Sequence, residues 1–212
     1  MADFPKQRAK MVERQLRRRG IFDERVLEAM GQVPREAFVP AKSRHRAYAD
    51  SALPIGEEQT ISQPWIVAAI CQALELRGEE RVLEVGTGSG YSAAVLSLLA
   101  AEVIGVERHE SLARGAGEVL SSLGMENVRV LIGDGSRGLP EAGPFEAIAV
   151  HATAPAPPPA LLAQLADGGR LVVPIAAEEA DALTVLRRRG EDVERREIAP
   201  CRFVPLIGEE GY

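Results

Sequence analysis

From about residue 80 onward, short apolar runs alternate with segments of helical period, and this alternation limits the possible folds more than any other feature of the sequence. Strands that alternate with helices form a parallel sheet covered by helices on both faces, because a parallel pair needs a crossover connection. The chain is therefore predicted to be an α/β protein with a doubly wound sheet. Strands are predicted at 81–85, 102–107, 127–132, 145–150 and 170–175, and helices at 91–99, 111–123 and around 161–165.

The residues before this alternation are typical of helices followed by a loop. Gly20 is predicted to end a first helix and Asp23 to cap a second, since these residue types are common at those positions. Residues 49–62 contain proline and glycine and show neither the helical nor the strand period, so a loop is predicted there. This loop would deliver Ser62 to the start of the next helix, with Pro64 near its first position.

The C-terminal residues are predicted to form an antiparallel hairpin, with strands at 182–188 and 193–199 around a turn at 190–192. A chain of 212 residues is short for two domains of the usual size, so one domain is predicted over 1–212. Its parts would be a helical extension with the loop at 1–62, a core at 63–181 and terminal strands at 182–212.

The segment Val82-Leu-Glu-Val-Gly-Thr-Gly-Ser-Gly-Tyr91 carries the strongest signal for a binding site. A buried strand leads into three glycines and then into a helix, which lets the backbone approach a ligand closely at the carboxyl edge of the sheet. A dinucleotide fingerprint would read G-x-G-x-x-G, but here the third glycine comes one residue earlier. The lysine of a P-loop is absent as well. We therefore expect a nucleotide-type pocket that does not bind a triphosphate.

Acidic residues follow the next two predicted strands. Glu107 could accept hydrogen bonds from both hydroxyls of a ribose, and Asp134, in Gly133-Asp-Gly135, could accept one from an adenine amino group. A glycine loop, an acid that can bind a ribose and a second acid after the following strand are typical of a site for adenosine without phosphates. S-adenosylmethionine fits such a site better than a dinucleotide does. Two alternatives stay open: both acids could be ordinary surface residues, or the sheet could belong to a non-catalytic nucleotide-binding protein or an oxidoreductase.

Charge and cysteine content exclude several other classes of function. The formal charge of −6 and the pI near 5.3 argue against binding to nucleic acid through overall charge. Residues 1–20 are basic and form either a solvated helix face or a partner-binding surface. Cys71 and Cys201 lie far apart without a histidine cluster, so core thiols and no metal site are expected. No signal peptide or membrane span is recognised, and a cytoplasmic protein without a membrane partner is expected.

Several motifs follow one another along nearly the whole chain. They are Met11-Val-Glu-Arg-Gln-Leu16, Val33-Pro-Arg-Glu-Ala-Phe-Val-Pro40, Tyr48-Ala-Asp50, Leu53-Pro-Ile-Gly56, Gln59-Thr-Ile-Ser-Gln-Pro64, the Gly86 loop, Gly133-Asp-Gly135 and Phe203-Val-Pro-Leu206. In this order they resemble the motifs of the protein-L-isoaspartate O-methyltransferases. The resemblance implies a class I methyltransferase fold with a seven-stranded sheet and a C-terminal antiparallel hairpin. It also implies methyl transfer from S-adenosylmethionine to the free α-carboxylate of isoaspartyl residues in damaged proteins, which initiates repair.

The resemblance also assigns roles to residues. Taken alone, Ser62 is ambiguous, because a serine before Gln-Pro is also a good helix N-cap. By resemblance, Ser62 is the catalytic residue. The loop before Ser62 and residues 203–206, of which Val204 and Pro205 are assigned to the substrate, flank an extended peptide, although 203–206 could equally be an edge strand. The product would be S-adenosylhomocysteine, and a monomer is favoured. The residues assigned to the cofactor are Thr60, Ile61, Ser62, Glu84, Gly86, Thr87, Gly88, Gly90, Glu107, Arg108, Asp134 and Gly135.

The sequence departs from the family pattern near the expected acceptor. Glu57-Glu58 stands where a glycine-bearing loop is common, and Pro174-Ile-Ala-Ala177 replaces a common Pro-Val-Gly. His151 and Thr153 stand in a stretch that is usually richer in alanine. Two additional carboxylates near the acceptor would repel an acidic peptide. The alternative is therefore a paralogue that methylates another carboxylate, such as a specific aspartate of a ribosomally made peptide.

Overall fold

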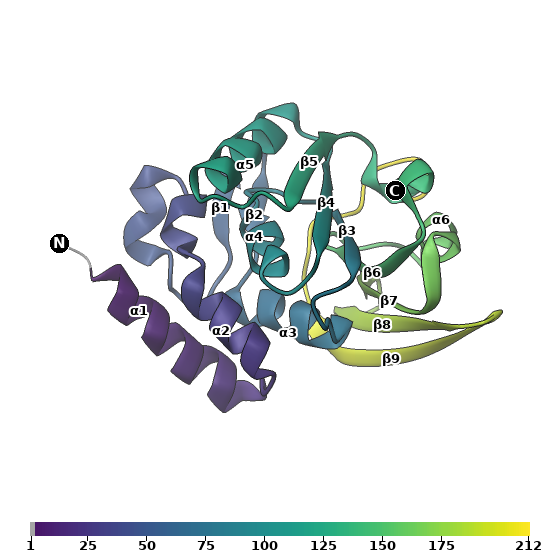
Figure 1. Ribbon diagram of the computed structural model, residues 1–212, viewed down its shortest axis with the longest axis horizontal. Coiled ribbons are helices and arrows are strands. Elements are labelled where there is room, and N and C mark those ends of the chain that lie inside the picture. Colours follow the sequence, from purple (N-terminus) through teal and green to yellow (C-terminus); the bar gives the residue numbers. More distant parts are fainter. Residues whose placement is uncertain (1–2) are drawn as a thin grey trace.

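The large sheet of this computed structural model contains seven strands in the order β5-β4-β3-β6-β7-β8-β9 within the described residues, 3–212 (Figure 1). The first two residues of the predicted 1–62 extension lie outside that range. The pairs from β5 to β7 are parallel and β8 and β9 form an antiparallel hairpin, as predicted. Strand β8 also pairs antiparallel with β7. The strands are β3 (Arg81–Val85), β4 (Glu102–Glu107), β5 (Val128–Ile132), β6 (Phe145–Val150), β7 (Leu165–Ile175), β8 (Asp181–Arg189) and β9 (Asp192–Cys201).

Helices pack on both faces of the sheet, and the strand period of two decides which residues they cover. On β3, Val82 belongs to the core that contains α3 (Pro64–Leu74) and α4 (Tyr91–Ser97). Leu83 and Val85 belong to a second core, on the other face, which includes Leu161 of α6 (Pro159–Ala163). Helix α5 (Glu110–Ser122) follows β4 and contributes Leu120 to the first core. The central strands are thus buried on both faces, which explains their nearly continuous apolar runs.

The N-terminal residues form two helical segments that pack against α3. The first begins as α1 (Phe4–Met11), continues through a π-helical turn (Val12–Leu16) and a 3₁₀ turn (Arg17–Arg19), and ends at Gly20, whose φ is +90°. The predicted end at Gly20 is therefore confirmed. Further 3₁₀ turns span Arg35–Phe38, Ala41–Arg46, Gly135–Arg137 and Pro140–Ala142.

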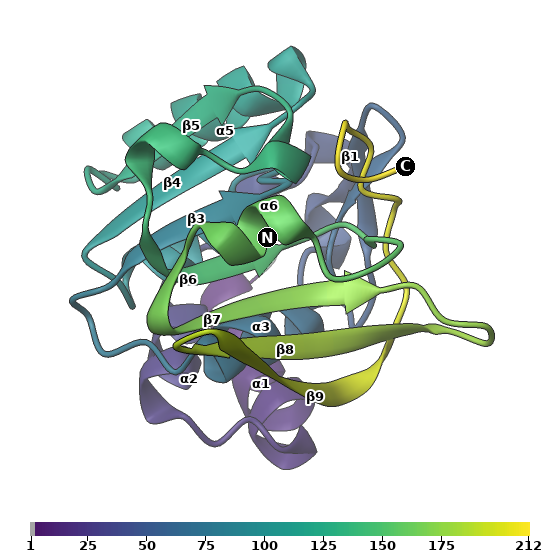
Figure 2. The same cartoon turned by 90° about the vertical axis from the view of Figure 1, so that its right-hand side faces the viewer.

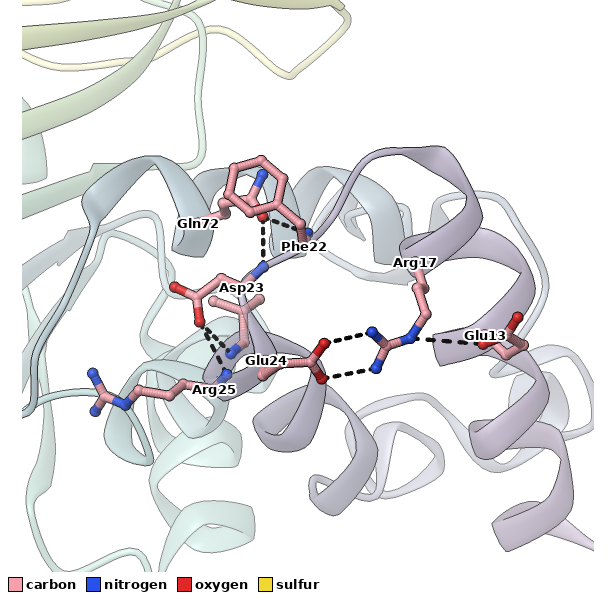
Figure 3. A network of polar contacts seen from close by, with 8 residues as sticks. Glu13, Arg17, Phe22, Asp23, Glu24, Arg25 and Gln72 are labelled. Atoms are coloured by element: carbon pink, nitrogen blue, oxygen red, sulfur yellow. Dashed lines mark hydrogen bonds and ion pairs between the residues drawn. The ribbon is translucent and has the colours of Figure 1, made fainter.

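Polar contacts fix the start of α2 (Glu24–Gln32), as Figure 3 shows. The Asp23 carboxylate accepts hydrogen bonds from the backbone N–H groups of Arg25 and Val26, at 2.9 and 3.4 Å, so the predicted cap is confirmed. The Gln72 side chain on α3 accepts from the N–H groups of Phe22 and Asp23, at 2.8 and 3.0 Å. These contacts tie the N-terminal helices to the core.

Three local predictions are wrong in their details. Residues 49–62 are not entirely loop, because β1 (Leu53–Gly56) and β2 (Gln59–Ile61) form a separate antiparallel hairpin. Both strands are too short to show alternation. Strand β7 begins at Leu165, not after the glycines at 168–169, because these lie in an irregularity of the β6–β7 register. Residues 203–206 form no strand, and Pro205 makes only an isolated bridge with Thr153.

No helix in the described range, 3–212, is both long and apolar enough to cross a membrane. Within the same residues, Cys71 and Cys201 are free thiols, and Cys71 is buried in the core as expected.

Candidate active site

Two neighbouring cavities lie at the carboxyl edge of the parallel strands. The first, of about 340 Å³, is lined by Val85, Gly86, Val106, Glu107, Gly135 and other residues, and we call it the glycine-loop cavity. The second, of about 560 Å³, is lined by Thr60, Ser62, Ile66, Gly88, Phe203 and others, and we call it the serine cavity. Both volumes fall in the range of small-molecule sites. Gln59, Glu107, His151 and Val204 line both cavities, so these residues mark their junction.

The loop after β3 requires glycine. Gly86, Gly88 and Gly90 have φ values of +81°, +56° and +88°, a conformation that other residues rarely adopt. The Gly86 N–H donates to the Val106 carbonyl at 2.9 Å, which continues the pairing of β3 with β4 into the start of this loop. Gly86 and Gly88 line the cavities with bare backbone, whereas Gly90 lies at the start of α4 and lines neither.

The Glu107 carboxylate is held so that it can accept hydrogen bonds from two hydroxyl groups. It ends β4 and is 5% exposed. Its Oε2 accepts from the Gly88 N–H and its Oε1 from the His109 N–H, each at 2.9 Å. A carboxylate oxygen can accept more than one hydrogen bond, so each oxygen keeps accepting capacity on the side that lines the cavities. This arrangement suits the two vicinal hydroxyls of a ribose.

Asp134 lies beside the glycine-loop cavity but does not line it. Its carboxylate accepts from the Ser136 N–H at 2.9 Å, from the Ser136 hydroxyl at 2.7 Å and from the Glu209 N–H at 2.8 Å. Burial raises the pKa of Asp134, but these hydrogen bonds stabilise the ionised form and leave the pKa below its ordinary value. About one of its four lone-pair positions remains free for a further donor.

Ser62 is positioned by a buried arginine. The helix begins at Pro64 with Gln63 as N-cap, so the alternative that Ser62 caps it is wrong. The Ser62 carbonyl accepts from Arg35 Nη2 at 2.7 Å, and Arg35 Nε donates to the Ala47 carbonyl at 2.8 Å. The Arg35 guanidinium is fully buried, 4.8 Å from the centre of the Tyr91 ring, and burial lowers its pKa. The backbone of Ser62 is thereby fixed at the edge of the serine cavity.

A buried polar cluster that the sequence did not predict lies at the junction. His151 Nε2 is 2.9 Å from the Ser92 hydroxyl and 3.2 Å from Glu84 Oε1. Glu84 is fully buried and lines neither cavity, in contrast to its predicted place in the cofactor site. A serine-histidine-acid relay needs its partners on opposite ring nitrogens, and here both contact the same nitrogen. His151 therefore forms no such relay with Ser92 and Glu84.

The hairpin turn at Glu57-Glu58 reaches the far side of the glycine-loop cavity. Glu57 Oε1 accepts from the Ser111 hydroxyl at 2.6 Å, and Glu57 Oε2 is 3.8 Å from His109 Nδ1. Both glutamates line this cavity and not the serine cavity. The sequence predicted that these carboxylates lie near the acceptor, and the structure places them at the glycine-loop cavity.

The structure brings together most, but not all, of the predicted site residues. Those that line a cavity are Thr60, Ser62, Gly86, Gly88, Glu107, Arg108, Gly135, Val204 and Pro205. Those that line neither cavity are Ile61, Glu84, Thr87, Gly90 and Asp134. Sequence reasoning assigned no role to several lining residues, chiefly Gln59, His151, Arg202 and Ile207. Of these, Gln59 stands inside a quoted motif, which could have indicated it.

The fold and the site together define a class of protein. A mostly parallel sheet that ends in an antiparallel hairpin, a glycine loop after β3 and an acid at the end of β4 are the features of a class I S-adenosylmethionine-dependent methyltransferase. The residues present fit the cofactor's nucleoside, because Glu107 retains accepting capacity at a cavity lined by bare glycine backbone.

Comparisons with known proteins identify the family. Residues 6–211 match the family model of protein-L-isoaspartate(D-aspartate) O-methyltransferases, and the chain belongs to this family. A protein-L-isoaspartate O-methyltransferase of Koribacter versatilis is 50% identical over 212 residues, which cover 100% of this chain and 96% of the relative. Another, from Roseiflexus castenholzii, is 52% identical over 210 residues, or 99% of this chain and 96% of the relative.

Solved structures agree with this assignment. A protein-L-isoaspartate O-methyltransferase superposes with a TM-score of 0.86 at 30% identity, covering 96% of this chain and 67% of the other. A second structure, of a Plasmodium falciparum protein described as a beta-aspartate methyltransferase in complex with S-adenosyl-L-homocysteine, gives a TM-score of 0.81 at 25% identity. That match covers 94% of this chain and 98% of the other. The predicted fold class and family are confirmed.

Proposed function

We propose that this protein transfers a methyl group from S-adenosylmethionine to the free α-carboxylate of L-isoaspartyl residues in damaged proteins. The observation that carries the proposal is the junction of the two cavities. Glu107, which suits a ribose, lines both cavities, and Ser62 lines the cavity on the acceptor side. A methyl donor in the glycine-loop cavity and a peptide carboxylate in the serine cavity would therefore meet at the junction of the two cavities.

The chemistry requires no general base. The acceptor is an α-carboxyl group, whose ordinary pKa is about 3.5, so it is already ionised at neutral pH. The cofactor supplies an electrophilic methyl group on a sulfonium. The chain's own contribution is to align the reacting groups and to exclude water, which supplies most of the rate in such a step. The buried arginine beneath Ser62 keeps the acceptor side in place for this alignment.

We assign the predicted residues as follows. Glu107 binds the ribose hydroxyls, and the backbone at Gly86 and Gly88 lies against the donor. Ser62 is the catalytic residue, since its hydroxyl orients the acceptor carboxylate by one hydrogen bond. Val204 and Pro205 flank the peptide, and their segment is held because the Val204 carbonyl accepts from the Thr153 N–H at 2.8 Å. Thr60 lies on the same side as Ser62.

We also propose that the chain works as one unit, because side chains of the N-terminal extension and of the sheet belong to a single buried core. The free state of the cysteines in the described chain favours a reducing compartment such as the cytoplasm.

A labelling experiment tests the proposal. Tritiated methyl groups from S-adenosylmethionine should enter an isoaspartyl peptide and not a peptide of the same sequence with normal aspartate. Equal labelling of the two peptides, or no labelling of either, would show that the protein has another acceptor.

A further inference from the structure

His151 lies at the junction of the two cavities, directly after the end of β6. Its N–H donates to the Val85 carbonyl at 2.9 Å, so its backbone is fixed beside the end of β3. Figure 2 shows β3 and β6 next to each other, with the C-terminal segment running past their carboxyl ends. The His151 side chain is 8% exposed and lines both cavities. A methyl donor and an acceptor that meet at this junction would therefore both lie close to the imidazole.

The imidazole contacts a buried carboxylate that has few other partners. Glu84 on β3 is fully buried, and neither of its oxygens makes a hydrogen bond within residues 3–212. Its ion-pair contact in this range is with His151 Nε2, which is 3.2 Å from Glu84 Oε1. A buried charge costs free energy unless an opposite charge lies near it. An ionised Glu84 therefore favours a positive charge on His151 or beside it.

The cluster accommodates both protonation states of the imidazole. His151 Nε2 also lies 2.9 Å from the Ser92 hydroxyl. A hydroxyl both donates and accepts, so Ser92 can donate to the neutral ring and accept from the protonated one. Histidine is the side chain whose charge ordinarily changes between about pH 5 and 8. With Glu84 ionised, the cluster therefore has one net negative charge or none, while its contacts stay in place.

The imidazole is the group at the junction whose charge changes near neutral pH. The carboxylates of Glu107 and Asp181 accept hydrogen bonds from other groups. Burial raises the pKa values of Cys71 and Cys201, so both thiols are neutral. Arg202 is exposed, so water and salt screen its charge. The other charged or titratable groups nearby line the glycine-loop cavity alone, and they are Glu57, Glu58, Arg108 and His109.

The charge of the cluster acts differently on the methyl donor and on its product. S-adenosylmethionine has a positive charge on its sulfur, whereas the thioether sulfur of S-adenosylhomocysteine has none, and the two molecules otherwise differ only by the methyl group. With a neutral imidazole, the Glu84 carboxylate attracts the sulfonium. With a protonated imidazole, the pair has no net charge and this attraction is lost. The difference in affinity between the two ligands therefore depends on the charge of His151.

We propose that His151 determines how strongly this site prefers the sulfonium cofactor to the thioether product: the neutral imidazole lets the buried Glu84 carboxylate attract the sulfonium, and the protonated imidazole cancels that attraction. This inference rests on the proposed function. The attraction disappears as the methyl group leaves, because the sulfur loses its charge, so it favours cofactor binding and product release and does not raise kcat. The product is then the weaker competitor wherever the imidazole is neutral.

Isothermal titration of the full chain with S-adenosylmethionine and with S-adenosylhomocysteine, without an acceptor, tests the inference. In the wild type, the ratio of the two affinities should shift about tenfold in favour of the product between about pH 8 and about pH 5.5. In His151→Gln, whose side chain is neutral throughout, the ratio should not depend on pH. His109→Gln is the matched control and should keep the wild-type dependence, because His109 lines the glycine-loop cavity alone.

A second measurement uses the wild type and does not depend on the folding of a variant. Because linkage is reciprocal, the NMR signal of the His151 ring should change at a pH about one unit lower with S-adenosylmethionine bound than with S-adenosylhomocysteine bound, the equivalent of a tenfold effect.

Three results overturn the inference while the binding of both ligands leaves the proposed function intact. They are an affinity ratio that does not depend on pH in the wild type, a dependence that persists in His151→Gln or is removed by His109→Gln, and equal NMR midpoints in the two complexes. A wild-type chain that binds neither ligand overturns the proposed function, and the inference with it.

Discussion

Replacing Glu58 by glycine should stabilise this protein, because the β1–β2 turn has the wrong residues for its backbone. Glu57 and Glu58 have φ values of +48° and +57°, so both turn residues adopt the left-handed conformation of a type I′ hairpin. Such turns favour Asn-Gly. Glu58 is exposed, and within residues 3–212 its side chain takes part in no hydrogen bond or ion pair that would offset the strain.

The magnitude follows from two opposing terms. A non-glycine residue in the left-handed region costs about 1–2 kcal/mol, which Glu58→Gly removes from the folded state. Glycine also increases the conformational entropy of the unfolded chain, which costs about 0.5–1 kcal/mol. The net gain in the free energy of unfolding is about 0.5–1 kcal/mol. For a domain of this size, that gain raises Tm by about 1–4 °C.

Thermal unfolding followed by circular dichroism, with urea titration as a cross-check, measures the change. Glu118→Gly is the matched control, since Glu118 is exposed in the middle of α5, where the backbone is right-handed. There the same substitution should cost about 0.5–1 kcal/mol and lower Tm. Lower stability in both variants would show that the turn is not strained, and the reasoning from its φ values would fail.

Three further outcomes are expected. Ser62→Ala should lower kcat on an isoaspartyl peptide about three- to tenfold, the effect of one lost hydrogen bond, and leave S-adenosylhomocysteine affinity nearly unchanged. Weaker S-adenosylhomocysteine binding with an unchanged kcat would show that Ser62 does not act on the acceptor. Arg35→Lys should lower the free energy of unfolding in urea by about 2–3 kcal/mol and reduce kcat. Lysine lacks the planar guanidinium that donates to both the Ala47 and Ser62 carbonyls. An unchanged free energy of unfolding would show that these two hydrogen bonds are dispensable. Folding lowers the pKa of Asp134, so the ionised carboxylate stabilises the protein above its ordinary pKa of about 3.9, and this stabilisation is lost as the pH falls further. Asp134→Asn should therefore make the free energy of unfolding less sensitive to acid. The same dependence on pH in the variant and the wild type would contradict this.

The sequence located the central strands well because their environment leaves a simple pattern. The predicted bounds 81–85, 102–107 and 145–150 are those of β3, β4 and β6, which are covered by helices on both faces and therefore read as uninterrupted apolar runs. The hairpin at 53–61 left no such pattern. Its strands are short, and its turn uses two glutamates in place of the residues that normally indicate a type I′ turn.

The sequence predicted the site residues that lie at the end of a single strand. It missed the contacts that form only when strands far apart in the sequence pair with each other. Gly86 and Glu107 follow directly from the ends of β3 and β4. The contact between Glu84 and His151 arises because β3 and β6 pair in the register Glu84–Ala149, which brings the residue just beyond β6 beside the acid. No spacing within the sequence encodes that register.

In the proposed mechanism, the acceptor binds in the serine cavity, and weak binding there suits this reaction. The acceptor's negative charge disappears as the ester forms, so a side chain that binds the carboxylate strongly would stabilise the ground state more than the transition state. The basic side chains that line this cavity are Arg202, which is exposed, and His151, whose Nε2 already contacts Ser92 and Glu84. A hydroxyl such as that of Ser62 orients the carboxylate without a full positive charge. Charge attraction would not distinguish an isoaspartyl residue from other carboxylates. If Val204 and Pro205 flank the peptide, as proposed, selectivity comes from where they hold its backbone.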